Sequence, residues 1–138
     1  MYDRLLVAID DSAATERVLK AASGLASLAN GEVWVLHLRE AEVLPKAMVP
    51  AAESRGEASK FVNEAVAELA KAGVKAHGEV RSTFYGQAAK EIIDDARSHD
   101  VGVIVMGSKG HGDLAGLLLG STAHKVIHLA DRPVLVVR

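Results

Sequence analysis

A run of glycines and hydroxyl-bearing residues follows a strongly apolar stretch in the C-terminal third of the chain. Residues 107–121 read GSKGHGDLAGLLLGS, with Gly107 and Gly110 near the start and Gly120-Ser121 at the end. Glycine lets the backbone approach a ligand closely. The first amides of a helix have no partner within it, and with the helix dipole they favour an anion such as phosphate. The spacing therefore indicates a phosphate-binding loop that leads into a helix.

Several side chains of this segment are candidates for contacts with phosphate. The hydroxyls of Ser121 and Thr122 would add donors at the start of the helix. Lys109 is the best candidate for a positive charge, with an exposed loop lysine as the equally weighted alternative. His111 is a further candidate, although histidines in loops often face solvent. The segment lacks the GKS or GKT of a Walker loop, and a glycine-rich turn that serves only the fold is the alternative.

Two carboxylates, Asp10 and Asp11, directly follow the first apolar stretch, LLVAI at residues 5–9. Asp10 cannot bind phosphate without a metal because like charges repel, but it suits a ribose hydroxyl, as acidic residues do in dinucleotide-binding folds. Asp11 has three interpretations. It weakens the binding of phosphate, it recruits Mg²⁺, or it faces solvent and caps the following helix, which we favour.

Apolar stretches and amphipathic patterns alternate along the chain. Short apolar stretches are typical of strands buried in a parallel sheet, and they cover residues 5–9, 33–38, 74–80, 101–106 and 133–137. Helical spacing lies between them, at residues 18–29, 61–69, 88–96 and 123–130. This alternation predicts an α/β fold with a parallel sheet and helices on both faces.

Local signals refine this assignment. Ser12 is the predicted N-cap of the first helix, and Asn30-Gly31 its predicted end. Residues 39–56 contain Pro45 and Pro50 around a weakly apolar stretch, so we predict a surface loop there. The stretch at 74–80 is more polar and alternating, which favours a place towards the edge of the sheet.

Composition excludes several classes of protein. The chain has 138 residues, 49% of them hydrophobic and 25% charged, which suits one globular domain. Its net charge of −2 argues against nucleic acid or an anionic membrane as a partner. The absence of cysteine excludes disulfides and thiolate chemistry. The sequence shows no signal peptide or membrane helix, so we expect a cytoplasmic protein.

The predicted strands place the candidate residues on one edge of the sheet. Ligands of open parallel sheets bind outside the carboxyl ends of the strands, where the strand order reverses. Asp10 follows the first predicted strand, and Gly107 follows the fourth. If these strands are neighbours, a carboxylate faces the glycine-rich segment across one crevice.

At this point the sequence closely resembles the universal stress protein family. The family's nucleotide-binding pattern, G-x2-G-x9-G-[ST], is matched in full by Gly107, Gly110 and Gly120-Ser121, and LLVAIDDS, VLHL and RPVLVVR resemble its first, second and last strands. The resemblance implies a single domain over residues 1–138. It also implies a doubly wound, open five-stranded parallel sheet in the order 3-2-1-4-5, with ATP between the first and fourth strands.

The resemblance also implies a role for each site residue. Asp10 would bind ribose, Ala8 and Ile9 would line the adenine, and the backbone of Leu38 would read the adenine edge. Met106 and Gly107 would cover the nucleotide, which we expect to carry Mg²⁺. The triphosphate would be held by residues at both ends of the glycine-rich segment: Gly110, Gly120, Ser121 and Thr122.

Two classes of function follow. The first is an ATP-binding stress-response regulatory protein whose nucleotide occupancy modulates a partner interaction, and a slow ATPase is a variant of it. The sequence shows no committed catalytic base, so efficient catalysis is not expected. The second is a dimeric interaction module without nucleotide dependence. Residues Pro133 to Arg138 form an apolar strand at the predicted edge, and family members resembling this one form homodimers there.

The histidines add little to these functions. His124 and His128 have the i, i+4 spacing of some metal ligands, but no third ligand is evident, so no metal site is predicted. His37 lies within a predicted buried strand, and we interpret it as a core histidine with satisfied hydrogen bonds.

Overall fold

Strands and helices alternate along the chain, as the apolar pattern predicts. The computed structural model describes residues 1–44, 47–51, 53–110 and 119–138. Its elements are β1 (Arg4–Ile9), α1 (Thr15–Ala29), β2 (Glu32–Leu44), β3 (Ala47–Val49), α2 (Arg55–Lys71), β4 (Lys75–Phe84), α3 (Ala88–Ser98), β5 (Val103–Gly107), α4 (Ser121–Leu129) and β6 (Val134–Val137). Over this described part of the chain, none of the helices combines the length and apolarity needed to cross a bilayer.

The parallel strands lie side by side in the order β4-β2-β1-β5-β6. With the short β3 left aside, this is the predicted order 3-2-1-4-5. Ile9 pairs with His37, and Ala8 pairs with Met106, so β1 and β5 end side by side, whereas β2 continues past them to Leu44. β4 and β6 lie at the two edges, as their sequences favoured.

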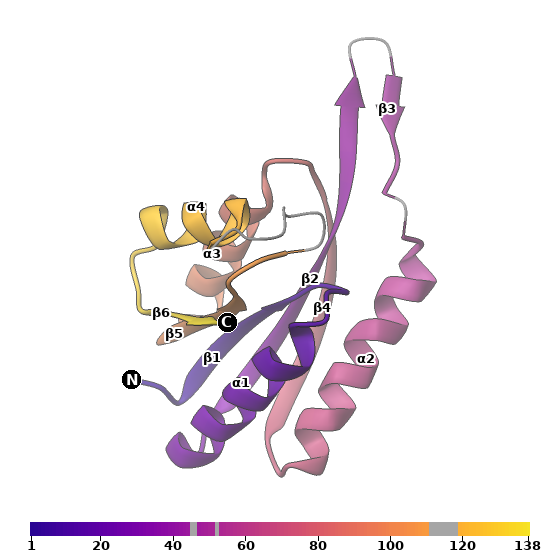
Figure 1. Ribbon diagram of the computed structural model, residues 1–138. Coiled ribbons are helices and arrows are strands. Elements are labelled where there is room, and N and C mark those ends of the chain that lie inside the picture. Colours follow the sequence, from indigo (N-terminus) through magenta and orange to yellow (C-terminus); the bar gives the residue numbers. More distant parts are fainter. Residues whose placement is uncertain (45–46, 52, 111–118) are drawn as a thin grey trace.

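The helices cover both faces of the sheet (Figure 1). α1 and α2 pack on one face, over a buried cluster that includes Leu5, Val7 and Val33. α3 and α4 pack on the other face, over a cluster that includes Leu6 and Ile104. Successive residues of a strand point to opposite faces. The unbroken apolar run of β1 therefore places this strand at the centre of both cores.

Residues 39–56 are not the predicted surface loop. β2 continues to Leu44 and pairs antiparallel with β3, through Glu42 and Val49 among others. Figure 1 shows this pair projecting beyond the rest of the sheet. β4 also extends to Phe84, and its edge supplies hydrogen-bonding partners for β2 as far as Ala41. The prediction failed because pairing between strands, which a local reading does not include, outweighs weak local propensity.

Of the two predicted ends of α1, one is confirmed and the other is wrong. Asn30 adopts the left-handed conformation with a φ of 51°, and the Gly31 amide donates to the carbonyl of Ala26, so the predicted helix end is confirmed. Ser12 is not the N-cap, because the helix begins at Thr15 after Ala14. The Ser12 amide instead donates to the Asp10 carboxylate, which organises the turn between β1 and α1.

Candidate functional site

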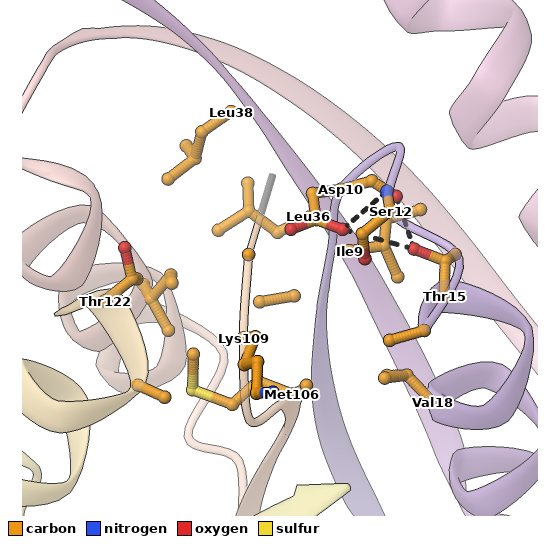
Figure 2. Close-up of a pocket in the computed structure, with 16 residues that line it drawn as sticks. Ile9, Asp10, Ser12, Thr15, Val18, Leu36, Leu38, Met106, Lys109 and Thr122 are labelled. Atoms are coloured by element: carbon orange, nitrogen blue, oxygen red, sulfur yellow. Dashed lines mark hydrogen bonds between the residues drawn. The ribbon is translucent and has the colours of Figure 1, made fainter. Parts of the chain in front are cut away.

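A crevice opens at the carboxyl ends of β1 and β5, against the middle of β2 and beside the first turns of α1 and α4. Figure 2 shows Asp10, Ser12 and Thr15 on one side of it and Thr122 on the other. Most of the residues predicted from the sequence line this crevice: Ala8, Ile9, Asp10, Leu38, Met106, Gly107, Lys109, Gly110 and Thr122. The fold therefore brings together residues from the first, second and fourth predicted strands, as the topology required.

The carboxylate of Asp10 is held in a fixed orientation at the end of β1. Its Oδ1 accepts a hydrogen bond of 2.9 Å from the Ser12 amide, and it lies 3.4 Å from the Thr15 hydroxyl. The same hydroxyl donates to the main-chain carbonyl of Asp10 (Figure 2). A side chain fixed by its own turn holds its carboxylate in one direction, which suits recognition of a ligand hydroxyl.

His37 is a buried histidine whose ring nitrogens both have partners, as predicted. Its Nδ1 lies 3.0 Å from the carbonyl oxygen of Ile9, and its Nε2 lies 2.7 Å from Oε1 of Glu53. A carbonyl can only accept, so Nδ1 carries the proton in this contact. The ring also packs edge-on against Phe61, at 5.0 Å between centroids. His37 thus ties the end of β1 to the segment that precedes α2.

The start of α4 forms the opposite wall. Among the described residues, no side chain caps this helix, so its first-turn amides lack a side-chain acceptor. The amide of Gly120, the N-cap residue, does have a main-chain acceptor, because it donates to the carbonyl of Ser108 at 2.5 Å. Its φ of −74° is open to any residue, so backbone conformation does not require glycine there. The amides that follow Gly120 are therefore the better candidates for an anion.

The remaining predicted residues lie in three situations. Lys109 is exposed, and it lines the crevice together with Gly110. Gly120 and Ser121 form the start of α4 but lie outside the residues that line the crevice, Gly120 being buried and Ser121 exposed. His111 lies outside the residues that the structure describes.

Charges are distributed unevenly around the crevice. Partial burial raises the pKa of Glu40, and the nearby Asp10 carboxylate raises it further, while His37 lowers it. Two carboxylates, Asp10 just after β1 and Glu40 within β2, therefore repel each other. Thr122 and the start of α4 lie across the crevice from Asp10, where an anion is favoured, and Lys109 adds a cation to the crevice lining. This asymmetry favours negative charge on the α4 side of the crevice.

Sequence reasoning missed several residues of the crevice wall. Thr15 and Val18 line it from α1, and Leu36, Ile92 and Ala123 contribute from other elements. Thr15 and Val18 are spaced by three residues, so they share one face of the first helical turns. That spacing could have identified these two residues from the sequence. The contact between His37 and Glu53 had no such signal, because Glu53 lies in the segment that was predicted to be a surface loop.

Comparison with known proteins places the chain. The sequence pattern of the Universal stress protein family matches residues 1–138. The chain belongs to this family. It is 36% identical over 153 aligned residues to universal stress protein YxiE of Bacillus subtilis, and the alignment covers 100% of each chain.

Solved structures of universal stress proteins share the fold. MJ0577 of Methanocaldococcus jannaschii superposes with a TM-score of 0.81 at 27% identity, covering 99% of this chain and 96% of that one. A universal stress protein from Archaeoglobus fulgidus, solved in complex with dAMP, has a TM-score of 0.73 at 27% identity and covers 99% of this chain and 98% of that one. A relative of this protein thus binds an adenine nucleotide.

Proposed function

We propose that this universal stress protein binds ATP in the crevice between β1 and β5, and that nucleotide occupancy modulates its interaction with a partner. The observation that carries the proposal is the pairing, across one crevice, of a fixed carboxylate with a helix start that no side chain of the described residues caps. Asp10 is oriented by the Ser12 amide on one side, and Thr122 stands in the first turn of α4 on the other. Ribose and phosphate need these two complementary groups.

The apolar wall supports the orientation of the base. Ala8, Ile9 and Leu38 line the crevice from β1 and β2. A planar, weakly polar adenine suits this wall, and Asp10 at the end of β1 is then adjacent for ribose. The charge asymmetry directs the phosphates towards α4. The structure of the dAMP complex from A. fulgidus supports an adenine nucleotide as the ligand class.

Mg²⁺ fits as a companion of the triphosphate rather than as a separately held ion. Mg²⁺ binds through one or two carboxylates together with the phosphates of its nucleotide. Asp10 and the exposed Asp11 are carboxylates at the ends of β1 and its turn. In this arrangement the ion would offset the repulsion between these groups and the phosphates.

The test is calorimetric titration of nucleotide-stripped protein with Mg-ATP. We expect one nucleotide per chain, with affinity reduced in Gly120→Val and Thr122→Val. Valine can adopt the φ of −74° and ψ of 167° found at Gly120, so the backbone does not preclude folding of that variant. Thr83→Val on β4, which lies outside the crevice lining, is the matched control for lost hydroxyls. A folded wild-type protein that binds no adenine nucleotide would overturn the proposal.

A second candidate function is dimer formation through β6. This strand pairs only with β5 among the described strands, and its Leu135 is 39% exposed. An apolar edge strand offers its hydrogen-bonding groups to another chain. Leu135→Lys should shift a dimer to monomer in analytical ultracentrifugation if β6 is the interface. An unchanged sedimentation profile would exclude β6 as the dimer contact.

A further inference from the structure

A second polar group lies on the face of the sheet that α3 covers, away from the crevice lining. Residues in alternate positions of a strand share a face, and β4 directs Glu79 and Arg81 towards Asp95 of α3. His99, just beyond the end of α3, completes the group. Ligand atoms of Glu79, Asp95 and His99 all lie within 4.8 Å of one another. We call these three residues the Glu79–Asp95–His99 group.

The carboxylates around Arg81, which include two members of this group, outnumber its single positive charge. Arg81 donates to Glu79 at 2.8 Å and to Asp95, and it lies 3.6 Å from Glu91. One guanidinium therefore faces three carboxylates, which leaves an excess of two negative charges among these four residues. Asp95 is 1% exposed, so water does not solvate its charge. A buried carboxylate without full compensation is costly.

Asp95 also has an oxygen without a partner. Its Oδ1 accepts from Arg81, whereas its buried Oδ2 has no hydrogen-bond partner in the described structure. Burial and the neighbouring Glu79 raise the pKa of Asp95 to about 6, against the opposing effect of Arg81. A buried carboxylate oxygen without a hydrogen-bond partner is unusual, and either a bound proton or a bound cation would satisfy it.

We propose that the Glu79–Asp95–His99 group binds a divalent first-row transition metal ion of the Zn²⁺ class. Nε2 of His99 lies 3.6 Å from Oδ1 of Asp95 and 4.0 Å from Oε2 of Glu79. Ligand atoms around one tetrahedral zinc lie about 3.3 Å apart. The two contacts of His99 thus need to close by less than 1 Å, and no pair within the group by more than about 1.5 Å, a shift that side-chain rotation provides.

The ligand set and its surroundings favour this class of ion. Two carboxylates and an imidazole suit Zn²⁺ and the other divalent first-row transition metal ions, whereas Ca²⁺ and Mg²⁺ prefer oxygen ligands alone. Glu79 and His99 are partly exposed, which gives an ion a path from solvent. Arg81 becomes an outer partner that orients the two carboxylates, as hydrogen-bonded neighbours of metal ligands do. The divalent charge matches the excess of two negative charges.

The single tryptophan of the chain is a built-in reporter of this site. Trp34 stacks on His99 at 4.8 Å between ring centroids, and it also stacks on His77 at 5.3 Å. A paramagnetic ion held by His99 therefore lies close enough to quench Trp34 fluorescence. The chain has no cysteine that would compete for the metal.

The test titrates nucleotide-free protein with Co²⁺ while Trp34 fluorescence is recorded, and repeats the titration with Zn²⁺ by calorimetry. We expect one ion per chain, with affinity at least about tenfold lower in His99→Gln, Glu79→Gln and Asp95→Asn. Asp94→Asn is the matched control, because Asp94 lies next to Asp95 but pairs with Lys90 at 2.6 Å. His77→Gln controls for the other ring stacked on Trp34.

Several results would overturn the proposal. Folded wild-type protein that binds neither ion would show that a proton alone satisfies Asp95. Unchanged affinity in His99→Gln and Glu79→Gln would place the ion elsewhere. An equal loss in Asp94→Asn would indicate attraction to the acidic surface in general. Because the titration contains no nucleotide, none of these outcomes depends on whether the crevice binds ATP.

Discussion

The crevice at the ends of β1 and β5 and the Glu79–Asp95–His99 group show two ways of placing polar groups against a parallel sheet. In the crevice, Asp10 is held by hydrogen bonds from Ser12 and Thr15 in its own turn. In the Glu79–Asp95–His99 group, carboxylates from a strand and a helix meet around Arg81, and a buried oxygen has no partner. The first site is organised locally, whereas the second depends on tertiary packing.

This difference has consequences for stability and for ligands. A locally organised site keeps its geometry without a ligand, so changes there should alter binding more than folding. A buried carboxylate that lies beside other carboxylates carries an unfavourable energy that a bound cation would relieve, so changes there should alter folding as well. The following variants test this contrast, beginning with the largest expected effect.

Arg81→Met should destabilise the fold by about 3 kcal/mol, because it leaves the buried Asp95 beside Glu79 without its guanidinium partner. Urea unfolding followed by circular dichroism measures this loss. Added Zn²⁺ should recover part of it by binding the folded state. Lys109→Met, which removes an exposed cation from the crevice, should change the free energy of unfolding by less than about 0.5 kcal/mol. Equal effects of the two variants would remove the contrast between the sites.

Asp10→Asn should lower the affinity for Mg-ATP by about tenfold or more, since a hydrogen bond to a charged group contributes roughly 1.5–3 kcal/mol. Asparagine keeps an oxygen that accepts from the Ser12 amide, so the turn before α1 should persist. Asp11→Asn is the neighbouring control and tests whether the second carboxylate contributes. Calorimetry separates the two positions. Full affinity in Asp10→Asn would show that ribose is not bound by this charge.

The contrast between the sites also explains what the sequence could predict. The parallel sheet and its order follow from continuous apolar strands such as β1 and from a resemblance that spans the chain. The crevice follows because Asp10 comes directly after β1 and Gly107 is the last residue of β5, and the topology brings those strand ends together. Position next to a strand end is information that a linear sequence contains.

The rest depends on contacts between distant residues. The extension of β2 towards β3 needs the edge of β4, which no pattern within residues 39–56 reveals. Nothing in the local sequence around Glu79, Asp95 and His99 singles these residues out. Only the packing of α3 against β4 buries Asp95 and turns these residues towards one another.

Glu40→Gln should raise the affinity for Mg-ATP by about two- to threefold, the scale of a partly exposed charge interaction. The pKa of Glu40 is raised by partial burial and by Asp10, so the folded protein disfavours its charge, and neutral glutamine removes this repulsion near the crevice. The gain should shrink as salt is added. Glu64→Gln on α2, outside the crevice lining, is the control. A salt-independent change would point to altered packing instead.

Gly107→Ala should leave the fold nearly unchanged, within about 0.5 kcal/mol, and still weaken Mg-ATP binding. A Cβ at this position would lie 3.4 Å from the carbonyl oxygen of Lys109 and 3.6 Å from Cγ2 of Val18, which are ordinary contacts. The fold therefore does not demand glycine there, although Gly107 lines the crevice at the start of the glycine-rich segment. Thermal unfolding and calorimetry on the same sample separate the two effects. Unchanged affinity would mean that the ligand leaves room for a methyl group, and a large loss of stability would return Gly107 to a purely structural role.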